Sequence, residues 1–525
     1  MPYVKRKFRR FYLRSKSVIL SDTKSTMAPI TPQLLLDHLR CVHKVWRDKY
    51  GPQSEKTDDD NPFLKLLWDR GIQHEADIVA GFGFEYLDCG RGSEAERIAM
   101  TNRALDDQVE YIYQGVLSSG DLYGIPDLLQ FVDGEYVPVE IKSGSATEGS
   151  ADTTDTKPKR EYGVQLALYV DILARKGLNR SRRAFVIATT GERIEFDLEE
   201  PLGPRTPSIW SIYQTTLDEV KLSLRGEFRT SPALSSTCKD CGWYKSCSSW
   251  AKENDDLTQL YSIGRAARDS FQRSFDLIGI DDILRLDPED LIQQKKADKS
   301  FLKGVGEGTI AKIYTRGPLL KSGGEPIMHV KYDFPEVATE LFFDIETDPT
   351  QDFAYLHGFY VRDREGERFQ HFTATSISPE NEREFWKRSI DFMMSFDPSN
   401  VAIYYYSPYE RTIYRQLRRK YLDVISEEDL EQLFARPTTI DLFKDVIEKG
   451  TDWPLPSYGI KSIAQHLGFK WRDETPSGAL SIQWFNDYLT TGNQALLDRV
   501  LEYNEDDCKA TMVVKDDLKK RMDRI

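Results

Sequence analysis

Two groups of acidic residues have the spacing that divalent-metal chemistry requires. In the first group, Asp127 ends the string IPD, and Glu140 and Lys142 follow in VPVEIKSG. Alternation along a strand places Glu140 and Lys142 on one face. Two carboxylates can hold Mg²⁺ or Mn²⁺, which activates water and polarises a phosphoryl oxygen, while the lysine stabilises transition-state charge. A Glu-x-Lys pair alone is commonly a surface ion pair, so the prediction of phosphodiester hydrolysis depends on the whole string.

The second group lies in the C-terminal third of the chain. Asp344 and Glu346 are two residues apart in LFFDIETD, and Tyr503 and Asp507 are four apart in the last long helical segment. Glu410 lies between them in YYYSPYERTIY. A two-metal site, with ions about 4 Å apart, needs three or four carboxylates, and a tyrosine hydroxyl can orient the attacking water. The order of these residues makes coincidental surface charge the weaker interpretation.

The first group resembles the PD-(D/E)XK pattern of RecB-type nucleases. Gln165 and Tyr169 match the Q-x₃-Y helix that flanks the site in those enzymes, and they share a helix face. His74, in RGIQHEADI, matches the early helix on which those nucleases carry a metal-binding histidine. The resemblance implies a restriction-endonuclease-like core in which His74, Asp127 and Glu140 hold a metal.

Three of the six cysteines follow the spacing C-x₂-C-x₅-C: Cys238, Cys241 and Cys247. In the iron–sulfur branch of RecB-like nucleases, which includes the CRISPR-adaptation and AddB types, three such cysteines join one far upstream. Cys41 is placed as that residue, and we expect it on a helix with Trp46 five residues later. The resemblance implies a [4Fe–4S] cluster, with a structural zinc as the rival. Cys89 and Cys508 are expected to be buried and without a metal.

The second group resembles the DEDDy exonucleases of RNase H-like fold. The resemblance implies that Asp344 bridges two metals, that Glu346 and Asp507 complete one site, and that Tyr503 orients water. Glu410 departs from the usual aspartate, but the YprB-like RNase H-like subfamily also tends to have glutamate here. It is assigned to the second metal. Asp441, in TTIDLF, is expected to cap a helix.

The elements around these motifs predict an α/β multidomain protein. Residues 1–30 form a basic flexible tail, 31–252 the RecB-like nuclease with its iron–sulfur staple, 253–335 a helical connector, and 336–525 the exonuclease-like domain. The connector contains LKGVGEGTIAKI, similar to a helix-hairpin-helix turn, in which the backbone at Gly304 and Gly306 would face a phosphate. A plain turn between helices is an equal alternative. Lys461 could reach a phosphate, although a surface lysine is the commoner role.

Composition restricts the functional class. The net charge of −14 argues against a protein that coats nucleic acid with its whole surface, but a local basic groove would suffice. No apolar run is long enough to span a bilayer, and the N-terminus lacks a secretory signal, so a cytoplasmic protein without membrane contact is expected. There is no GxxxxGK[ST] phosphate loop, so any helicase would act as a partner in trans.

Together the motifs predict a metal-dependent nuclease with two sites, one RecB-like and one 3′–5′ exonuclease-like, acting on single-stranded DNA ends. Two other functions stay open. One is a nucleic-acid-binding scaffold or helicase accessory with one inactive site, for which Glu410 makes the C-terminal site the suspect. The other is an RNA-processing nuclease, because both motifs tolerate either sugar.

Overall fold

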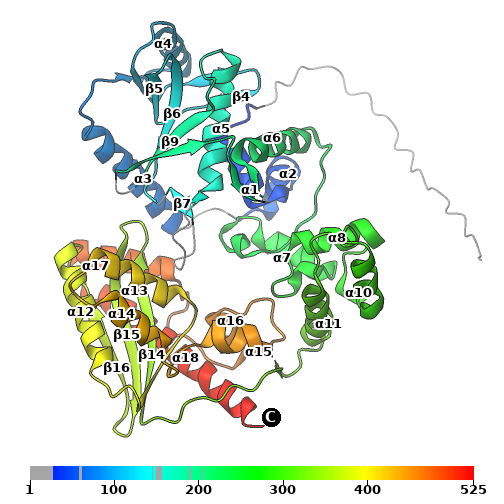
Figure 1. Ribbon diagram of the computed structural model, residues 1–525, viewed down its shortest axis with the longest axis vertical. Helices are drawn as coiled ribbons and strands as arrows, with labels where there is room; N and C mark the ends of the chain where they lie inside the picture. Colours follow the sequence, from blue (N-terminus) through cyan, green and yellow to red (C-terminus); the bar gives the residue numbers. More distant parts are fainter. Residues whose placement is uncertain are drawn as a thin grey trace, which may run out of the picture.

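The computed structural model describes residues 28–57, 62–144, 146–148, 157–188, 191–204 and 206–524. Most of the predicted basic tail, residues 1–27, lies outside this range. The buried hydrophobic residues of the described chain gather in three regions, within residues 30–220, 257–313 and 334–522. Figure 1 shows the corresponding parts as a blue-to-cyan α/β unit, a green helical unit and a yellow-to-red α/β unit.

The N-terminal unit is organised around a mixed six-stranded sheet. Its order is β1 (Leu87–Asp88), β2 (Tyr111–Tyr113), β5 (Leu128–Val132), β6 (Glu135–Ile141), β9 (Arg183–Ile187) and β10 (Arg193–Asp197). Strands β5 and β6 form an antiparallel hairpin through Asp133 and Gly134, both with positive φ, as the Asp-Gly pair predicts. Strands β6 and β9 are parallel, and helix α5 (Arg160–Arg175) lies between them in the chain.

The remaining elements of this unit flank the sheet. They are α1 (Pro32–Arg40), α2 (Val42–Tyr50), η1 (Gln53–Glu55), α3 (Pro62–Ala80), α4 (Glu94–Asp106), β3 (Leu117–Ser119), β4 (Leu122–Gly124), β7 (Thr147–Glu148), β8 (Lys157–Pro158), β11 (Pro201–Gly203), β12 (Thr206–Ser208), α6 (Ile209–Arg225), η2 (Ser236–Asp240) and α7 (Tyr244–Glu253).

One prediction about this unit is wrong. Cys41 does not lie on a helix: it has an extended backbone, with φ −155°, and separates α1 from α2. Its amide still donates to Asp37 O at 2.9 Å, so Cys41 ends one helix and precedes the next. Apolar residues are buried on both sides of this break: Leu35 on α1 and Val45 on α2.

The middle unit is helical, as predicted. It contains η3 (Leu257–Gln259), α8 (Arg265–Phe275), α9 (Ile280–Ile283), α10 (Pro288–Ala297) and α11 (Glu307–Ser322). The turn between α10 and α11 has Gly304 at φ +84°, and Gly306 is the N-cap of α11. The turn between these two helices therefore lies at the predicted glycines. The positive φ at Gly304 favours glycine at that position.

The C-terminal unit has a five-stranded sheet. Its order is β16 (Gly366–Thr373), β15 (Phe353–Asp363), β14 (Thr339–Asp348), β17 (Val401–Tyr405) and β18 (Thr439–Asp441). The first three strands are antiparallel, whereas β14, β17 and β18 run parallel. The long helix α18 (Gln494–Met522) contacts β14 and β15. This packing brings Asp507, near the middle of the helix, against the sheet.

Shorter elements complete this unit. They are β13 (Ile327–Met328), α12 (Pro379–Met394), α13 (Tyr409–Lys420), α14 (Glu427–Ala435), η4 (Leu442–Ile447), α15 (Glu448–Gly450), β19 (Thr451–Asp452), α16 (Ile460–His466) and α17 (Gly478–Thr491).

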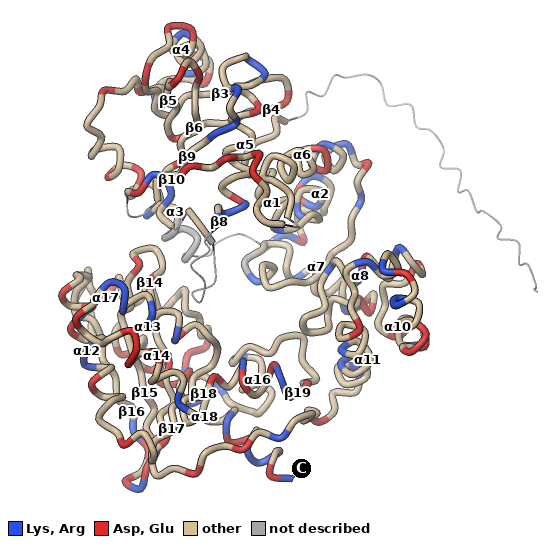
Figure 2. The backbone as a smooth tube through the Cα atoms, viewed as in Figure 1, with Lys and Arg blue, Asp and Glu red and all other residues tan. Residues whose placement is uncertain are grey.

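Arginine side chains make polar contacts between the units. Arg70 on α3 donates to Asp348 at 2.6 Å and to Asn486 at 2.8 Å in the C-terminal unit. Arg316 on α11 donates to Asp452 at 2.6 Å. Figure 2 shows basic and acidic residues interspersed along the tube, rather than separated between units. None of the helices described has both the length and the apolar character needed to cross a membrane.

Candidate active sites

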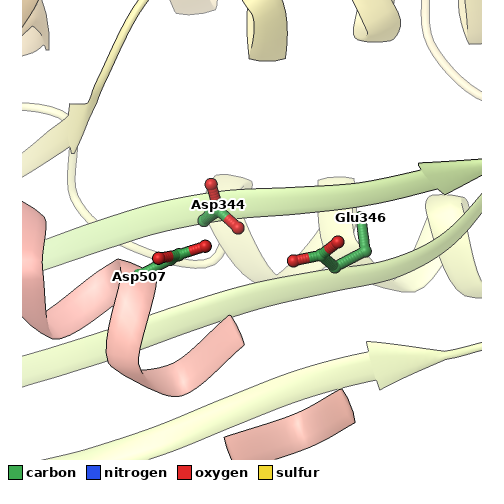
Figure 3. A group of neighbouring side chains, drawn as sticks. All are labelled: Asp344, Glu346 and Asp507. Carbon is green, nitrogen blue, oxygen red and sulfur yellow. The ribbon is translucent and has the colours of Figure 1, made fainter. Parts of the chain in front are cut away.

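The C-terminal site forms where β14 faces the middle of α18. Asp344 and Glu346 lie on β14 and Asp507 lies on α18. One carboxylate oxygen from each lies within 4.8 Å of the others, and Figure 3 shows the side chains close together. Three carboxylates at this spacing offer the oxygen ligands that Mg²⁺ or Mn²⁺ prefers. The structure thus brings together three of the residues predicted for this site.

Hydrogen bonds hold these carboxylates in place. Asn504 donates to Asp344 at 2.6 Å, Tyr355 to Glu346 at 3.2 Å, and Trp471 to Asp507 at 2.7 Å. The motifs in the sequence do not predict these three hydrogen-bond donors. Asn504 could have been found from its position inside the YNEDD string, but Tyr355 and Trp471 carry no comparable signal.

The acids are close enough to raise one another's pKa. Burial, followed by the charges of Asp507 and Glu346, raises the pKa of Asp344 well above its usual range. Burial and the charge of Asp507 raise the pKa of Glu346 to about 8. Burial also raises the pKa of Asp507, against the opposing charge of Lys461. A cation that fits between them would relieve this repulsion, so the donor set suits a divalent metal.

Glu410 lies near the triad but outside its 4.8 Å group. It is 3 % exposed at the start of α13, and its Oε2 atom has no hydrogen-bond partner among the described residues. Burial raises its pKa to about 8, and the charges of Asp441 and Asp507 contribute. Asp441 accepts from the Lys444 amide at 2.9 Å, as expected for a helix cap, and burial raises its pKa to about 6. The structure therefore adds Asp441 to the acids facing Glu410.

Tyr503 and Lys461 complete the polar surroundings of this site. Burial, with the charges of Asp507 and Glu346, raises the pKa of Tyr503 far above its usual value, so the hydroxyl is protonated. Lys461 donates to Tyr503 Oη at 3.0 Å and to the Pro476 carbonyl at 2.7 Å. The Lys461 side chain is half-buried beside the acids, and its contact with a phosphate stays a prediction.

The N-terminal site forms at the β5–β6 hairpin. Lys142 donates to Glu140 Oε2 at 2.5 Å, and the Ile141 amide donates to Asp127 Oδ2 at 2.7 Å. Burial and the charge of Glu140 raise the pKa of Asp127 well above its usual range. Glu140 is 1 % exposed, and its Oε1 has no hydrogen-bond partner in the described chain. These three residues therefore lie close together, and the Oε1 atom of the buried Glu140 is available to a cation.

Helix α3 reaches this site through Glu75. Gln114 donates to Glu75 at 2.6 Å and to Asp127 at 3.4 Å, and Tyr113 donates to Glu75 at 2.9 Å. Gln114 thus connects Glu75 to Asp127 through hydrogen bonds. His74 lies one residue earlier, with Nε2 buried and unpartnered among the described residues. Gln114 and Tyr113 went unrecognised, because nothing in their spacing marks them.

Gln165 and Tyr169 lie together behind the N-terminal acids. Gln165 donates to Tyr169 Oη at 3.1 Å, and Tyr169 donates to the Ile125 carbonyl at 3.3 Å. Burial and the charge of Glu140 raise the pKa of Tyr169 well above its usual range. The helix thereby supports the IPD turn and faces Glu140, which agrees with a flanking role.

The four predicted cysteine ligands line one pocket of about 550 Å³: Cys41, Cys238, Cys241 and Cys247. No three of these thiols lie within 4.8 Å of one another in the described chain, so the structure does not show a cysteine metal cluster. A zinc–sulfur bond of about 2.3 Å would put thiolates roughly 3.8 Å apart. The cysteines therefore share a pocket without the spacing of a single zinc ion. Cys89 and Cys508 are buried, as expected.

Fold and site geometry define an α/β protein with two acidic centres of the nuclease type. Comparison with protein families agrees. Residues 38–248 match the PD-(D/E)XK nuclease superfamily, and residues 341–519 match the RNase H superfamily. A search of curated proteins finds none that matches. The chain thus carries a PD-(D/E)XK nuclease domain followed by a C-terminal RNase H-like domain.

Proposed function

We propose that this protein is a metal-dependent nuclease with two active sites, acting on single-stranded DNA ends. The observation that carries the proposal is the triad of Asp344, Glu346 and Asp507, each of which places a carboxylate oxygen within 4.8 Å of the others. Both matched superfamilies hydrolyse phosphodiesters with divalent metals, which supports two sites. The 3′–5′ direction at the C-terminal site rests on resemblance to the DEDDy exonucleases.

In the C-terminal site, Asp344, Glu346 and Asp507 would hold Mg²⁺ or Mn²⁺, with Glu410 toward a second ion. The metals supply activation of water and stabilisation of phosphoryl charge. The Tyr503 hydroxyl would orient the attacking water, and its hydrogen bond from Lys461 at 3.0 Å supports this role. In the N-terminal site, Asp127, Glu140 and His74 would hold the metal, and Lys142 would stabilise transition-state charge.

The decisive experiment uses end-labelled single-stranded DNA and RNA with Mg²⁺ or Mn²⁺, and chelator as the blank. Asp127→Asn and Asp344→Asn should each remove one component of cleavage, by at least about a hundredfold, because each loses a metal ligand. Asp487→Asn, at an exposed carboxylate on α17, should cleave like the wild type. If the double variant digests at the wild-type rate, both sites are misassigned. Tight binding without cleavage would favour the scaffold function.

We also propose that Cys41, Cys238, Cys241 and Cys247 hold a [4Fe–4S] cluster. Their common pocket, together with thiols too far apart for one zinc ion, supports a group larger than a single ion. Arg47 and Lys44 line the same pocket and would offset the charge of four thiolates. Iron and sulfide analysis with the visible spectrum of anaerobically purified protein tests this. A colourless protein with one zinc per chain would contradict it.

A further inference from the structure

A polar pocket lies beside the C-terminal site and is not used by the mechanism above. It has a volume of about 490 Å³, and its lining includes Arg411, Arg415, Arg436, Thr439, Asp441 and Lys444. We name it the Arg436 pocket. Arg411 directly follows Glu410 on α13, and the charge of Asp441 acts on Glu410. The pocket is therefore adjacent to the Glu410 side of the acidic centre.

Cations outnumber carboxylates in this lining, by four to two. Glu431 fixes two of them, since it accepts from Arg411 at 2.7 Å and from Arg415 at 2.5 Å. Arg436 differs, because no carboxylate of the described chain lies within ion-pairing distance of its guanidinium. Its positive charge is therefore available to a bound anion.

The two carboxylates already have donors. Asp441 accepts from the amides of Ser407 at 3.1 Å and Lys444 at 2.9 Å. Asp445 accepts from Lys449 at 3.0 Å. Hydrogen bonds to donors stabilise a carboxylate and weaken its repulsion of another anion. The acids therefore oppose an anionic ligand less than their number implies.

Three donors at this pocket are buried without an acceptor among the described residues: Arg411 Nε, Arg436 Nη1 and Thr439 Oγ1. Thr439 is 6 % exposed, so water does not satisfy its hydroxyl freely. An unsatisfied buried donor costs about 1–3 kcal/mol, and most such groups in native proteins have a partner. Three unsatisfied donors from two arginines and a threonine indicate an absent acceptor with several oxygen atoms.

We propose that the Arg436 pocket binds a phosphate group of the substrate strand, one that lies outside the scissile bond. This inference rests on the proposed nuclease function and deepens it. Guanidinium groups match phosphate oxygens with paired hydrogen bonds, whereas the Lys444 ammonium is already paired with Glu448 at 2.6 Å. Contacts of this kind fix the register of a strand without reading its sequence. The pocket would thus hold the strand while the acids act on a neighbouring linkage.

The test measures binding rather than cleavage. The parent is Asp127→Asn/Asp344→Asn, with fluorescence anisotropy of a labelled single-stranded oligonucleotide in Ca²⁺ at several salt concentrations. Adding Arg436→Gln should weaken binding about tenfold and reduce the slope of log K against log salt by about 0.7, because one phosphate contact is lost. Arg419→Gln, at an exposed arginine on α13, is the control and should change affinity less than about twofold.

Thr439→Val supplies a second readout. Because the hydroxyl is buried without a partner, valine should leave the melting temperature unchanged or raise it, while oligonucleotide affinity falls about threefold. A lower melting temperature with unchanged affinity would make Thr439 merely structural and overturn its role here.

The remaining outcomes separate the possible failures. If the parent binds the oligonucleotide and Arg436→Gln behaves like Arg419→Gln, the pocket proposal alone is overturned. Inorganic phosphate supplies a further comparison. If it raises the melting temperature of the parent but not that of Arg436→Gln, while both bind the oligonucleotide equally, the pocket binds free phosphate and the strand assignment is wrong. If the parent binds neither DNA nor RNA, the proposed function and this inference fail together.

Discussion

The carboxyl group of Glu346 is buried among like charges, and this has a cost at neutral pH. Its pKa is raised from an ordinary 4.5 to about 8, first by burial and then by the charge of Asp507. Below pH 4.5 the folded and unfolded states both bind the proton. Above it the unfolded chain ionises freely, while the folded chain keeps the proton until about pH 8. The free energy of unfolding of the metal-free protein therefore falls as the pH rises through this window.

Glu346→Gln should remove that cost. We expect the variant's C-terminal unit to melt higher than the wild type by about 2–4 °C at pH 8 without metal, and by less at pH 5. Mg²⁺ should then raise the melting temperature of the wild type more than that of the variant, because the variant has lost a ligand. Scanning calorimetry at both pH values checks this. An equal difference at pH 5 and pH 8 would rule out charge repulsion as the cause.

Among single residues, the sequence predicts the candidate metal ligands better than the side chains that donate hydrogen bonds to them. Asp344, Glu346 and Asp507 could be predicted, because strand alternation and helical spacing determine which face each occupies. Trp471 and Tyr355 could not, since their hydrogen bonds to Asp507 and Glu346 depend on where a loop and a second strand pack.

Helix α3 contacts both α/β units. Arg70 binds Asp348, which lies two residues beyond Glu346 on β14, and five residues later Glu75 binds Gln114 beside Asp127. The Asp348 side chain is 1 % exposed, so this ion pair is largely shielded from water. One rigid helix thus connects the strand of one site to the hairpin of the other.

Arg70→Ala should loosen this connection. In the Asp127→Asn background, where the C-terminal site acts alone, we expect cleavage to slow about fivefold, because Asp348 loses its cation at the end of β14. Gln73→Ala is the control on the same helix, since Gln73 pairs with Asp77 at the surface. Labelled-substrate cleavage compares them. Equal rates for the two variants would show that α3 does not support the C-terminal site.

The sequence predicted elements unevenly. Strand β14 and helix α18 were predicted from apolar runs and helical periodicity over many residues. The break at Cys41 could not be, because the apolar pattern continues through it and only the packing of α1 and α2 separates them. The contact between α3 and α17 joins residues far apart in the chain, and no local pattern encodes it.

Across the whole molecule, separate hydrophobic cores are joined by polar contacts. On the nuclease side, Trp243 donates to Asp48 at 2.8 Å, and the Thr57 amide donates to the Gly242 carbonyl at 2.9 Å. These bonds join the cysteine segment to α2 and to the residues that follow η1. On the other side, Arg316 of the connector binds Asp452, while Tyr261 stacks on Tyr458 with ring centroids 3.9 Å apart.

The Arg316–Asp452 pair makes the connector part of the RNase H-like side. Both side chains are nearly buried, at 6 % and 8 % exposure, and His329 also binds Asp452 at 2.8 Å. Removing one partner of a buried pair leaves the other charge uncompensated, which costs about 3–5 kcal/mol. Arg316→Met should therefore lower the stability of the C-terminal unit by that amount and separate its melting from that of the connector.

Lys321→Ala serves as the matched control, because Lys321 lies on the same helix and pairs with Asp255 and Asp281 at the surface. It should cost less than about 1 kcal/mol. Arg316→Met/Asp452→Leu should recover most of the loss, since apolar side chains replace both buried charges. Urea unfolding followed by tryptophan fluorescence and limited proteolysis measures all three. If Arg316→Met is no more harmful than Lys321→Ala, the connector is not anchored to the C-terminal unit through this pair.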